Sequence, residues 1–476
     1  MPLRAFNRQQ SWLLPPTLGD LIPDDHPSRF VATFVDALDQ SQWSDLGVGA
    51  EGEALGAPAY HPKALLAVWL YGFMTGVRSS RKLEIACRDQ VPYLWLTGWQ
   101  RPDHNTLWRF YRDHRDAMRN LLKYTVATAI ESGLVDLALQ SLDGTKLVAN
   151  AAGERTYDGK DLRGLLSRVD AAIGELEAQN EAGEGTSPAH LPKELEETKA
   201  LKRRVQDAMG RLSRNGGQIN LTDQDAKLMK GRRAIMPGYN AQAMVSPLSS
   251  DTGSKRVIIT AADVVTNASD SGQLAPMLEQ AEELTGYRSP VTLADGGYHT
   301  AAALKAGETR GQLLVMGDRH TDDSARPYFK DRFRYDADND SYICPHGQRL
   351  HFSGLRRSKV TGIRDYKVYR ASRTACRTCS AFGECTKDRH SGRTLWITSS
   401  DMLLLRHRAW MRSREALALY ARRRELSEPT FGVIKDQMNA RRLLLRGLAN
   451  VRAEFSLLAA AFNLRTLWAT CSKTTP

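Results

Sequence analysis

The sequence predicts an α/β protein in which a mixed sheet is flanked by helices, preceded by an all-α segment. Short apolar or alternating segments, which are typical of strands, recur at residues 136–143, 239–247, 256–262, 290–295 and 313–316. Segments with helical periodicity occur before the first strand, between strands at 271–285, and again at 401–468. Together these patterns favour a sheet enclosed by helices.

The composition is that of a globular protein with a basic surface. The 476 residues exceed one ordinary domain and predict two or three. The formal net charge of +12 favours a nucleic-acid partner, although a basic protein without such a partner has the same composition. No window approaches 18 uninterrupted apolar residues, and the first residues lack a signal-peptide pattern. We therefore expect no membrane span and a cytoplasmic protein.

Residues 1–135 predict a compact basic helical domain. Helical periodicity recurs at 30–38, 62–74, 83–86, 105–111 and 118–130. The segment is rich in basic residues, namely Arg78, Arg81, Lys82, Arg88, Arg101, Arg109, Arg112 and Arg115. This composition suggests a domain for DNA binding or dimerisation. A solvated charged surface explains the same residues equally well.

A charged helical hairpin is predicted at about 158–215. Residues 161–212 have helical periodicity and many charges, and the loop formers of 183–188 interrupt them. We expect two antiparallel helices at roughly 160–180 and 190–213. The hairpin could pack against a second subunit, clamp DNA, or act as a solvated spacer.

Two predicted strands end on Asp-Gly, at Asp143-Gly144 and at Asp295-Gly296-Gly297. Carboxylates crowded at strand ends repel one another unless a cation lies between them. Mg²⁺ takes oxygen ligands and keeps positions open for phosphates, and two such ions can catalyse phosphodiester displacement. Asp-Gly is also a common turn dipeptide. The catalytic interpretation rests on the intervening strand–strand–strand–helix–strand order, which opens a ribonuclease-H-like fold.

A third carboxylate, Glu428, lies in a helical segment that also carries cations. Lys435 is seven residues further on, so a continuous helix would place both on one face with Tyr420 and Arg424. A carboxylate between cations suits a metal ligand beside a phosphate-binding pair. Pro429 disfavours helical geometry at Glu428, and a helix restarting at Pro429 would put Glu428 at its start. The alternative is a salt-bridged surface helix.

Four of the six cysteines lie between residues 344 and 385 and predict a metal site. Cys376 and Cys379 form a short pair, and Cys344 and Cys385 can complete a tetrahedral Zn²⁺ site. His346 is a possible substitute ligand. We therefore expect an irregular, zinc-ribbon-like insertion at 321–400, stapled by structural Zn²⁺. Reduced cysteines in a loop are the alternative.

Several motifs occur in a fixed order: LDGTKLVANAA (142–152), MPGYNAQAMVS (236–246), TLADGGYHT (292–300) and the Glu428-x6-Lys435 segment. In this order and spacing the chain resembles bacterial insertion-sequence transposases with a DDE catalytic domain. It is most similar to the group with a cysteine cluster before the final Glu (the IS-eleven-eighty-two group). The resemblance implies a catalytic triad of Asp143, Asp295 and Glu428 that holds two Mg²⁺ or Mn²⁺ ions.

The resemblance also implies DNA-contacting roles. Tyr420, Arg423 or Arg424, and Lys435 would join Glu428 in the family's Tyr-Arg-Glu-Lys signature. The implied enzyme binds double-stranded DNA at the element ends, hydrolyses phosphodiester bonds and transfers the 3′-hydroxyl ends to target DNA. A homodimer in the synaptic complex and a bacterial, nucleoid-associated location would accompany this activity.

The expected organisation has four parts. They are a helical domain (1–135), the first part of a ribonuclease-H-like core (136–320), the cysteine-rich insertion (321–400) and the C-terminal helical part of the core (401–476). Two other functions are compatible with the sequence. One is a transposase-derived DNA-binding protein without catalysis, and the other is a metal-dependent nuclease without strand transfer.

Overall fold

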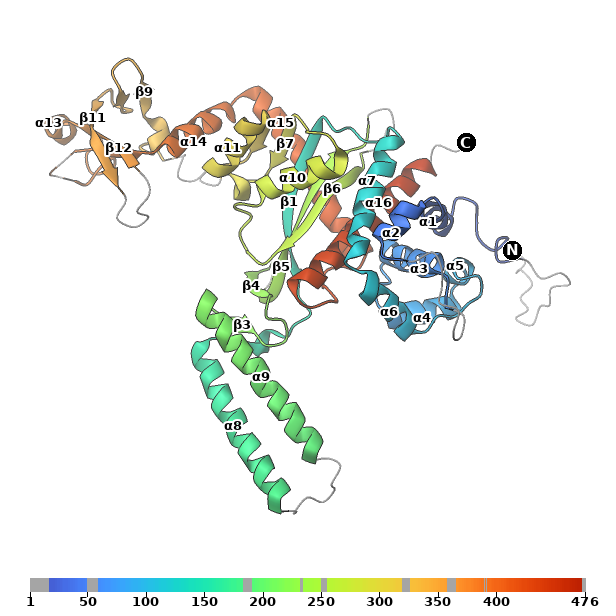
Figure 1. The fold of residues 1–476 in the computed structure, drawn as a ribbon. Helices are drawn as coiled ribbons and strands as arrows, with labels where there is room; N and C mark the ends of the chain where they lie inside the picture. The colour runs from blue at the N-terminus through green and yellow to red at the C-terminus, as the bar shows by residue number, and fades with distance from the viewer. Residues whose placement is uncertain are drawn as a thin grey trace, which may run out of the picture.

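A computed structural model describes residues 17–48, 59–182, 191–231, 234–249, 255–318, 326–357, 365–388, 390 and 392–472. It has a central sheet with helices on both faces, a long helical hairpin that projects from the core, and a smaller sheet set apart from the central sheet (Figure 1). None of the helices in these residues combines the length and apolar character needed to cross a membrane.

The central sheet is mixed. β1 pairs antiparallel with β5 and parallel with β7, which continues in parallel to β8, while β6 and β4 both pair antiparallel with β5. This mixed sheet fits the predicted ribonuclease-H-like core. The strands are β1 (Leu139–Val148), β4 (Lys227–Lys230), β5 (Ile235–Pro247), β6 (Val257–Val265), β7 (Val291–Ala294) and β8 (Leu313–Met316).

Helices cover both faces of this sheet. Because successive strand residues face opposite sides, β1 divides its side chains between two cores. Leu142 packs in one core with α10 (Leu274–Thr285) and α11 (Ala301–Arg310). Ser141 faces the other side, where it contacts α15 (Arg414–Gly432). Asp143 has the same parity as Ser141 and therefore faces α15.

The prediction that the first strand ends at Asp143-Gly144 is wrong. β1 continues through both residues to Val148, and Gly144 pairs with Gln242 of β5. A Cβ atom at Gly144 would lie 2.5 Å from Gln242 Nε2, so this glycine permits close packing rather than a turn. Asp295 does end its strand, and its Oδ1 accepts a 2.7 Å hydrogen bond from the N–H of Gly297.

The N-terminal part is all-α, as predicted, and it shares one hydrophobic core with the sheet and with α16 (Leu448–Cys471). A buried ion pair of 2.7 Å between Arg78 and Glu454 joins this part to α16. The helices are α1 (Pro27–Asp36), α2 (Gln40–Asp45), α3 (Pro62–Thr75), α4 (Ser80–Asp89), α5 (Val91–Leu96), α6 (His104–His114), η1 (Ala117–Arg119) and α7 (Asn120–Glu131).

The hairpin consists of α8 (Gly159–Ala182) and α9 (Leu191–Asn215), close to the predicted positions. Two strands, β2 (Thr156–Tyr157) and β3 (Ile219–Asn220), pair at its base. Its own small core includes Leu162, Val205 and Ala208. The hairpin therefore projects as a self-packed pair of helices (Figure 1).

The prediction of an irregular cysteine-rich segment is wrong for the residues that the structure describes. They form a five-stranded antiparallel sheet in the order β13-β12-β11-β10-β9. Three of its strands are only three or four residues long, which is too short for a clear alternating pattern in the sequence. The elements are η5 (Lys330–Arg332), β9 (Arg334–Asp336), β10 (Ser341–Ile343), β11 (Arg349–Arg357), β12 (Asp365–Ala371), α13 (Arg373–Arg377) and β13 (Thr394–Ile397), followed by α14 (Ser399–Trp410).

Candidate active site

Asp143 and Asp295 lie on neighbouring parallel strands. The register pairs Leu142 with Ala294, so the two aspartates follow a paired position and come side by side. Burial raises the pKa of Asp143 to about 6; the N–H of Gly144 and Arg423 oppose this rise, and the charges of Asp295 and Asp270 add to it. The site therefore gathers acidic groups whose joint ionisation is unfavourable without a cation.

Helix α15 brings cationic and polar side chains onto Asp143 and its neighbours. Arg423 Nη1 lies 3.6 Å from Asp143 Oδ2, and its guanidinium carbon lies 5.8 Å from the centre of the Tyr420 ring. One turn further on, Ser427 and Ser141 share a 2.6 Å hydrogen bond. Arg424, the other candidate in the signature, is exposed. The helix therefore turns Arg423, and not Arg424, towards the aspartates.

The expectation that a helix restarts at Pro429 is wrong. α15 runs without interruption to Gly432 with Pro429 inside it, so Glu428 lies within the helix and not at a helix start. Proline lacks the N–H that would bond to the carbonyl of Glu425, and both residues are exposed, so water can satisfy that carbonyl. The chain then continues as a π-helical turn, η6 (Val433–Gln437).

The structure places Glu428 next to the aspartates in the fold without completing a triad. Its side chain is exposed, and its backbone follows Ser427, which contacts β1. Among the described residues, no group of three or more His, Cys, Asp or Glu side chains is arranged to hold a metal ion. The structure therefore brings Asp143 and Asp295 together, and it does not arrange Glu428 with them as a metal site.

Lys435 returns to the same strand from the π-helical turn. Its Nζ donates a hydrogen bond to the hydroxyl of Thr145, two residues beyond Asp143 on the same face of β1. A π-helical turn contains more residues than an α-helical turn, so the seven residues from Glu428 to Lys435 do not form the two regular α-helical turns assumed from the sequence. Ser427, Arg423 and Lys435 thus contact alternate residues of β1.

Asp270, which the sequence analysis missed, lies behind the two aspartates. Its Oδ1 accepts hydrogen bonds from Asn240 Nδ2 (2.7 Å), Gln242 Nε2 (2.9 Å) and Lys146 Nζ (3.4 Å). Its Oδ2 lies 3.2 Å from where a Cβ atom of Gly297 would be. In the sequence, Asp270 precedes a helical segment and therefore resembles a helix N-cap. The signal for a role in the site is its position shortly after a predicted strand.

Tyr298 extends this network to the turn that carries Asp295. Its hydroxyl donates a hydrogen bond to Gln242 Oε1, while Gln242 Nε2 donates to Asp270. Burial, followed by the charge of Asp270, raises the pKa of Tyr298, so the hydroxyl remains a donor. The loop after β6, strand β5 and the Asp295 turn are therefore connected on the face of β1 opposite α15.

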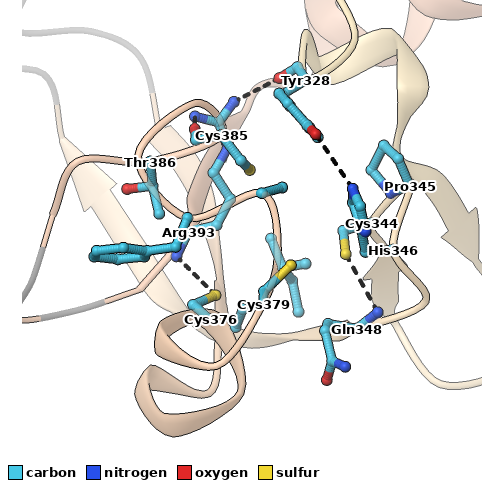
Figure 2. Close-up of a pocket in the computed structure, with 14 residues that line it drawn as sticks. Tyr328, Cys344, Pro345, His346, Gln348, Cys376, Cys379, Cys385, Thr386 and Arg393 are labelled. Atoms are coloured by element: carbon cyan, nitrogen blue, oxygen red, sulfur yellow. Dashed lines mark hydrogen bonds between the residues drawn. The ribbon is translucent and has the colours of Figure 1, made fainter.

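The four clustered cysteines line one cavity, together with His346 (Figure 2). Cys344 Sγ accepts a 3.2 Å hydrogen bond from the N–H of Gln348. Burial raises the pKa of Cys385, and the other three thiols add to this effect. The structure thus gathers the predicted ligands around one cavity. Among the described residues, however, no three of them are arranged to hold a metal ion.

Comparison with known families agrees with this architecture. Residues 343–468 match the transposase DDE domain, and residues 16–113 match the transposase domain (DUF772). The first match contains Glu428 and Lys435, whereas Asp143 and Asp295 lie outside both. These matches support a transposase as the class of protein. They also confirm the resemblance to a bacterial insertion-sequence DDE transposase. No match was found among curated proteins or solved structures.

Proposed function

We propose that this protein is a DDE transposase of an insertion sequence. It would bind the element ends, hydrolyse DNA phosphodiester bonds there, and transfer the 3′-hydroxyl ends to target DNA. The observation that carries the proposal is the placement of Asp143 and Asp295 on adjacent parallel strands beneath Arg423. The match to the transposase DDE domain covers α15, the helix that carries Arg423. Together these two observations favour phosphoryl transfer over DNA binding alone.

The acidic site suits divalent cations. Burial and the charges of Asp295 and Asp270 raise the pKa of Asp143. A cation bound at the site would offset both the burial of the charge and the repulsion between carboxylates. We propose that Asp143, Asp295 and Glu428 hold two Mg²⁺ or Mn²⁺ ions. Such ions supply activation of the attacking oxygen and stabilisation of the leaving oxygen. Glu428 would join the site by a movement of its exposed side chain.

The protein's own cations would position the DNA. Arg423 lies against Asp143, and Lys435 lies against Thr145, so both are placed to contact a scissile strand at the aspartates. Tyr420 supports the guanidinium of Arg423, and the exposed Arg424 would reach DNA outside the pocket. We propose a homodimer in the DNA complex because two element ends must be brought together.

The cysteine cavity suits structural Zn²⁺. The thiols of Cys376, Cys379 and Cys385 meet there with that of Cys344, which is remote in sequence, and thiolates are preferred zinc ligands. Backbone N–H groups of Gln348 and Arg393 donate to Cys344 and Cys376, respectively, as expected for sulfurs carrying negative charge. We propose that Cys344, Cys376, Cys379 and Cys385 bind the ion, with His346 beside them as an alternative ligand.

The test is cleavage of a labelled element-end duplex with Mg²⁺ or Mn²⁺. We expect nicking by the wild type and none by Asp295→Ala or Glu428→Ala. The matched control is Glu425→Ala, because Glu425 is an exposed glutamate on the same helix. Joining of a supplied 3′-hydroxyl end to target DNA would distinguish a transposase from a nuclease.

Each other outcome has a definite meaning. Equal cleavage by the wild type and by Asp295→Ala would remove Asp295 from the mechanism. Specific end binding by a wild type that cleaves with neither metal would favour a DNA-binding protein without catalysis.

A further inference from the structure

One face of the five-stranded sheet has no role in the function proposed above. Opposed residues on paired strands share a face, so the register defines this outer face. Trp396 is opposite Val368, Arg356 is opposite Tyr366, and His351 is opposite Arg370. The outer face includes Arg334, His351, Arg356, Tyr366, Val368, Arg370 and Trp396, and the register adds Asp336, Arg349 and Gly354 to it.

The cysteines lie on the other face. Leu350 and Ala371 are paired across β11 and β12, and both line the cysteine cavity. They alternate with His351 and Arg370, which are exposed. The zinc site and the outer face therefore occupy opposite sides of one sheet, and a ligand can approach the outer face without disturbing the cysteines.

The outer face presents aromatic rings to solvent. Trp396 is 48% exposed, and its ring meets the Tyr366 ring edge-on with centroids 5.7 Å apart. Val368 is fully buried between these strands, so apolar atoms lie directly below the rings. Gly354, opposite Val368 on the neighbouring strand, has no atom within 4 Å of where its Cβ would be. A flat group can therefore lie against the rings.

The charge of the outer face is positive. Arg334, Arg356 and Arg370 are exposed and make no ion pair with another residue that the structure describes. Asp336 shares this face, but its carboxylate is paired with Arg349 at 2.5 Å. The exposed Trp396 ring and the half-buried Tyr366 ring lie among arginines that have no ion-pair partner in the described part of the chain, so a base and a phosphate could both be contacted.

We propose that the outer face binds a DNA strand whose bases are unpaired. Trp396 and Tyr366 would stack on bases, while Arg356 and Arg370 would contact the phosphates on either side. Unpaired bases are required because the faces of paired bases are already stacked within a duplex. The inference rests on the proposed function, in which strands are cut at the element end. The small sheet lies beyond α14, apart from the N-terminal helices (Figure 1).

The test uses the full-length protein, a labelled single-stranded oligonucleotide of mixed sequence and the matching duplex, without divalent metal. We expect Trp396→Ala to weaken single-strand binding by about 5- to 150-fold, as for loss of one base stack, and to change duplex binding little. Arg356→Ala and Arg370→Ala should each lower the salt slope of single-strand binding by about 0.7. Trp396→Phe should retain most of the affinity.

Leu355→Ala is the matched control. Leu355 lies on β11 of the same sheet, is 62% exposed, and is opposite Lys367 on the other face. Equal binding by Trp396→Ala and the wild type, or equal weakening in Leu355→Ala, would overturn the proposal. Asp295→Ala should bind the single strand normally. Loss of cleavage in that variant with no Trp396 effect would therefore leave the transposase proposal intact and remove only this inference.

Discussion

The guanidinium of Arg423 lies 3.6 Å from the carboxylate of Asp143, and the two side chains are only 14% and 17% exposed. Its neighbour Arg424 points to solvent. Helix α15 thus separates two adjacent arginines into an active-site group and a surface group. Ser427, one turn beyond Arg423, fixes this rotation through its hydrogen bond to Ser141.

This separation predicts unequal effects of two matched substitutions. Arg423→Ala should slow end cleavage by about 100-fold or more, because it removes a preorganised cation at the site of charge development. Arg424→Ala should leave the rate close to that of the wild type. Single-turnover cleavage of the end duplex measures both. The reverse order of effects would assign the catalytic position to Arg424.

Asp270 is expected to hold Asp143 and Asp295 in register. Asp270→Ala removes the acceptor shared by Asn240, Gln242 and Lys146, and should lower cleavage by about 100-fold through misplacement of the turn that carries Asp295. Asp270→Asn keeps an Oδ1 acceptor and should recover most of the activity. The rise in melting temperature on adding Mn²⁺ should follow the same order. An equal loss in both variants would contradict a positioning role.

Removal of one partner of the buried Arg78–Glu454 pair should strongly destabilise the protein. Its side chains are 4% and 1% exposed, and burial both lowers the pKa of Arg78 and raises that of Glu454. Arg78→Met would leave a buried carboxylate unpaired and should cost about 3–5 kcal/mol in urea unfolding. Adding Glu454→Gln should restore part of this loss, because the amide oxygen still accepts from Leu444 and Leu445. The exposed Arg88→Met serves as control and should not shift the midpoint.

Zinc should co-purify with the protein and depend on the cysteine cavity. Cys376→Ser should abolish the bound zinc measured by elemental analysis, because Cys376 lies in the cavity with the other three thiols. Cys471→Ser, on a cysteine outside the cavity, should retain it. Wild-type protein that contains no zinc, prepared without chelator, would refute the proposed site.

The pKa of Asp143 predicts how metal-free stability depends on pH. A carboxyl group whose pKa rises from 3.8 to about 6 on folding stabilises the fold at low pH, and this contribution is lost as pH rises through about 6. In EDTA, the stability of the wild type relative to Asp143→Asn should therefore fall between pH 4 and 6, by up to about 3 kcal/mol. Urea titrations at several pH values measure the difference. A constant difference across this range would contradict the shift.

Much of the architecture follows from local sequence. The strand at 313–316 and the paired helices near 160–180 and 190–213 have bounds close to those predicted, because side-chain periodicity reports directly on which face is buried. The small sheet is not predicted because β9, β10 and β13 are only three or four residues long, too short for a clear alternating pattern. The course of β1 through Gly144 was misjudged because Asp-Gly is equally typical of a turn.

By itself the sequence determined the order of the main strands along the chain. It also indicated the two aspartates at the ends of predicted strands and the four cysteines that share a cavity. Only the tertiary structure decided that Arg423 and not Arg424 faces Asp143, that Asp270 connects the two aspartate-bearing segments, and that Arg78 is buried against Glu454. The physical reason is that chain order and periodicity are local. The rotation of a helix against a sheet, and the partner of a buried charge, depend on residues hundreds of positions away.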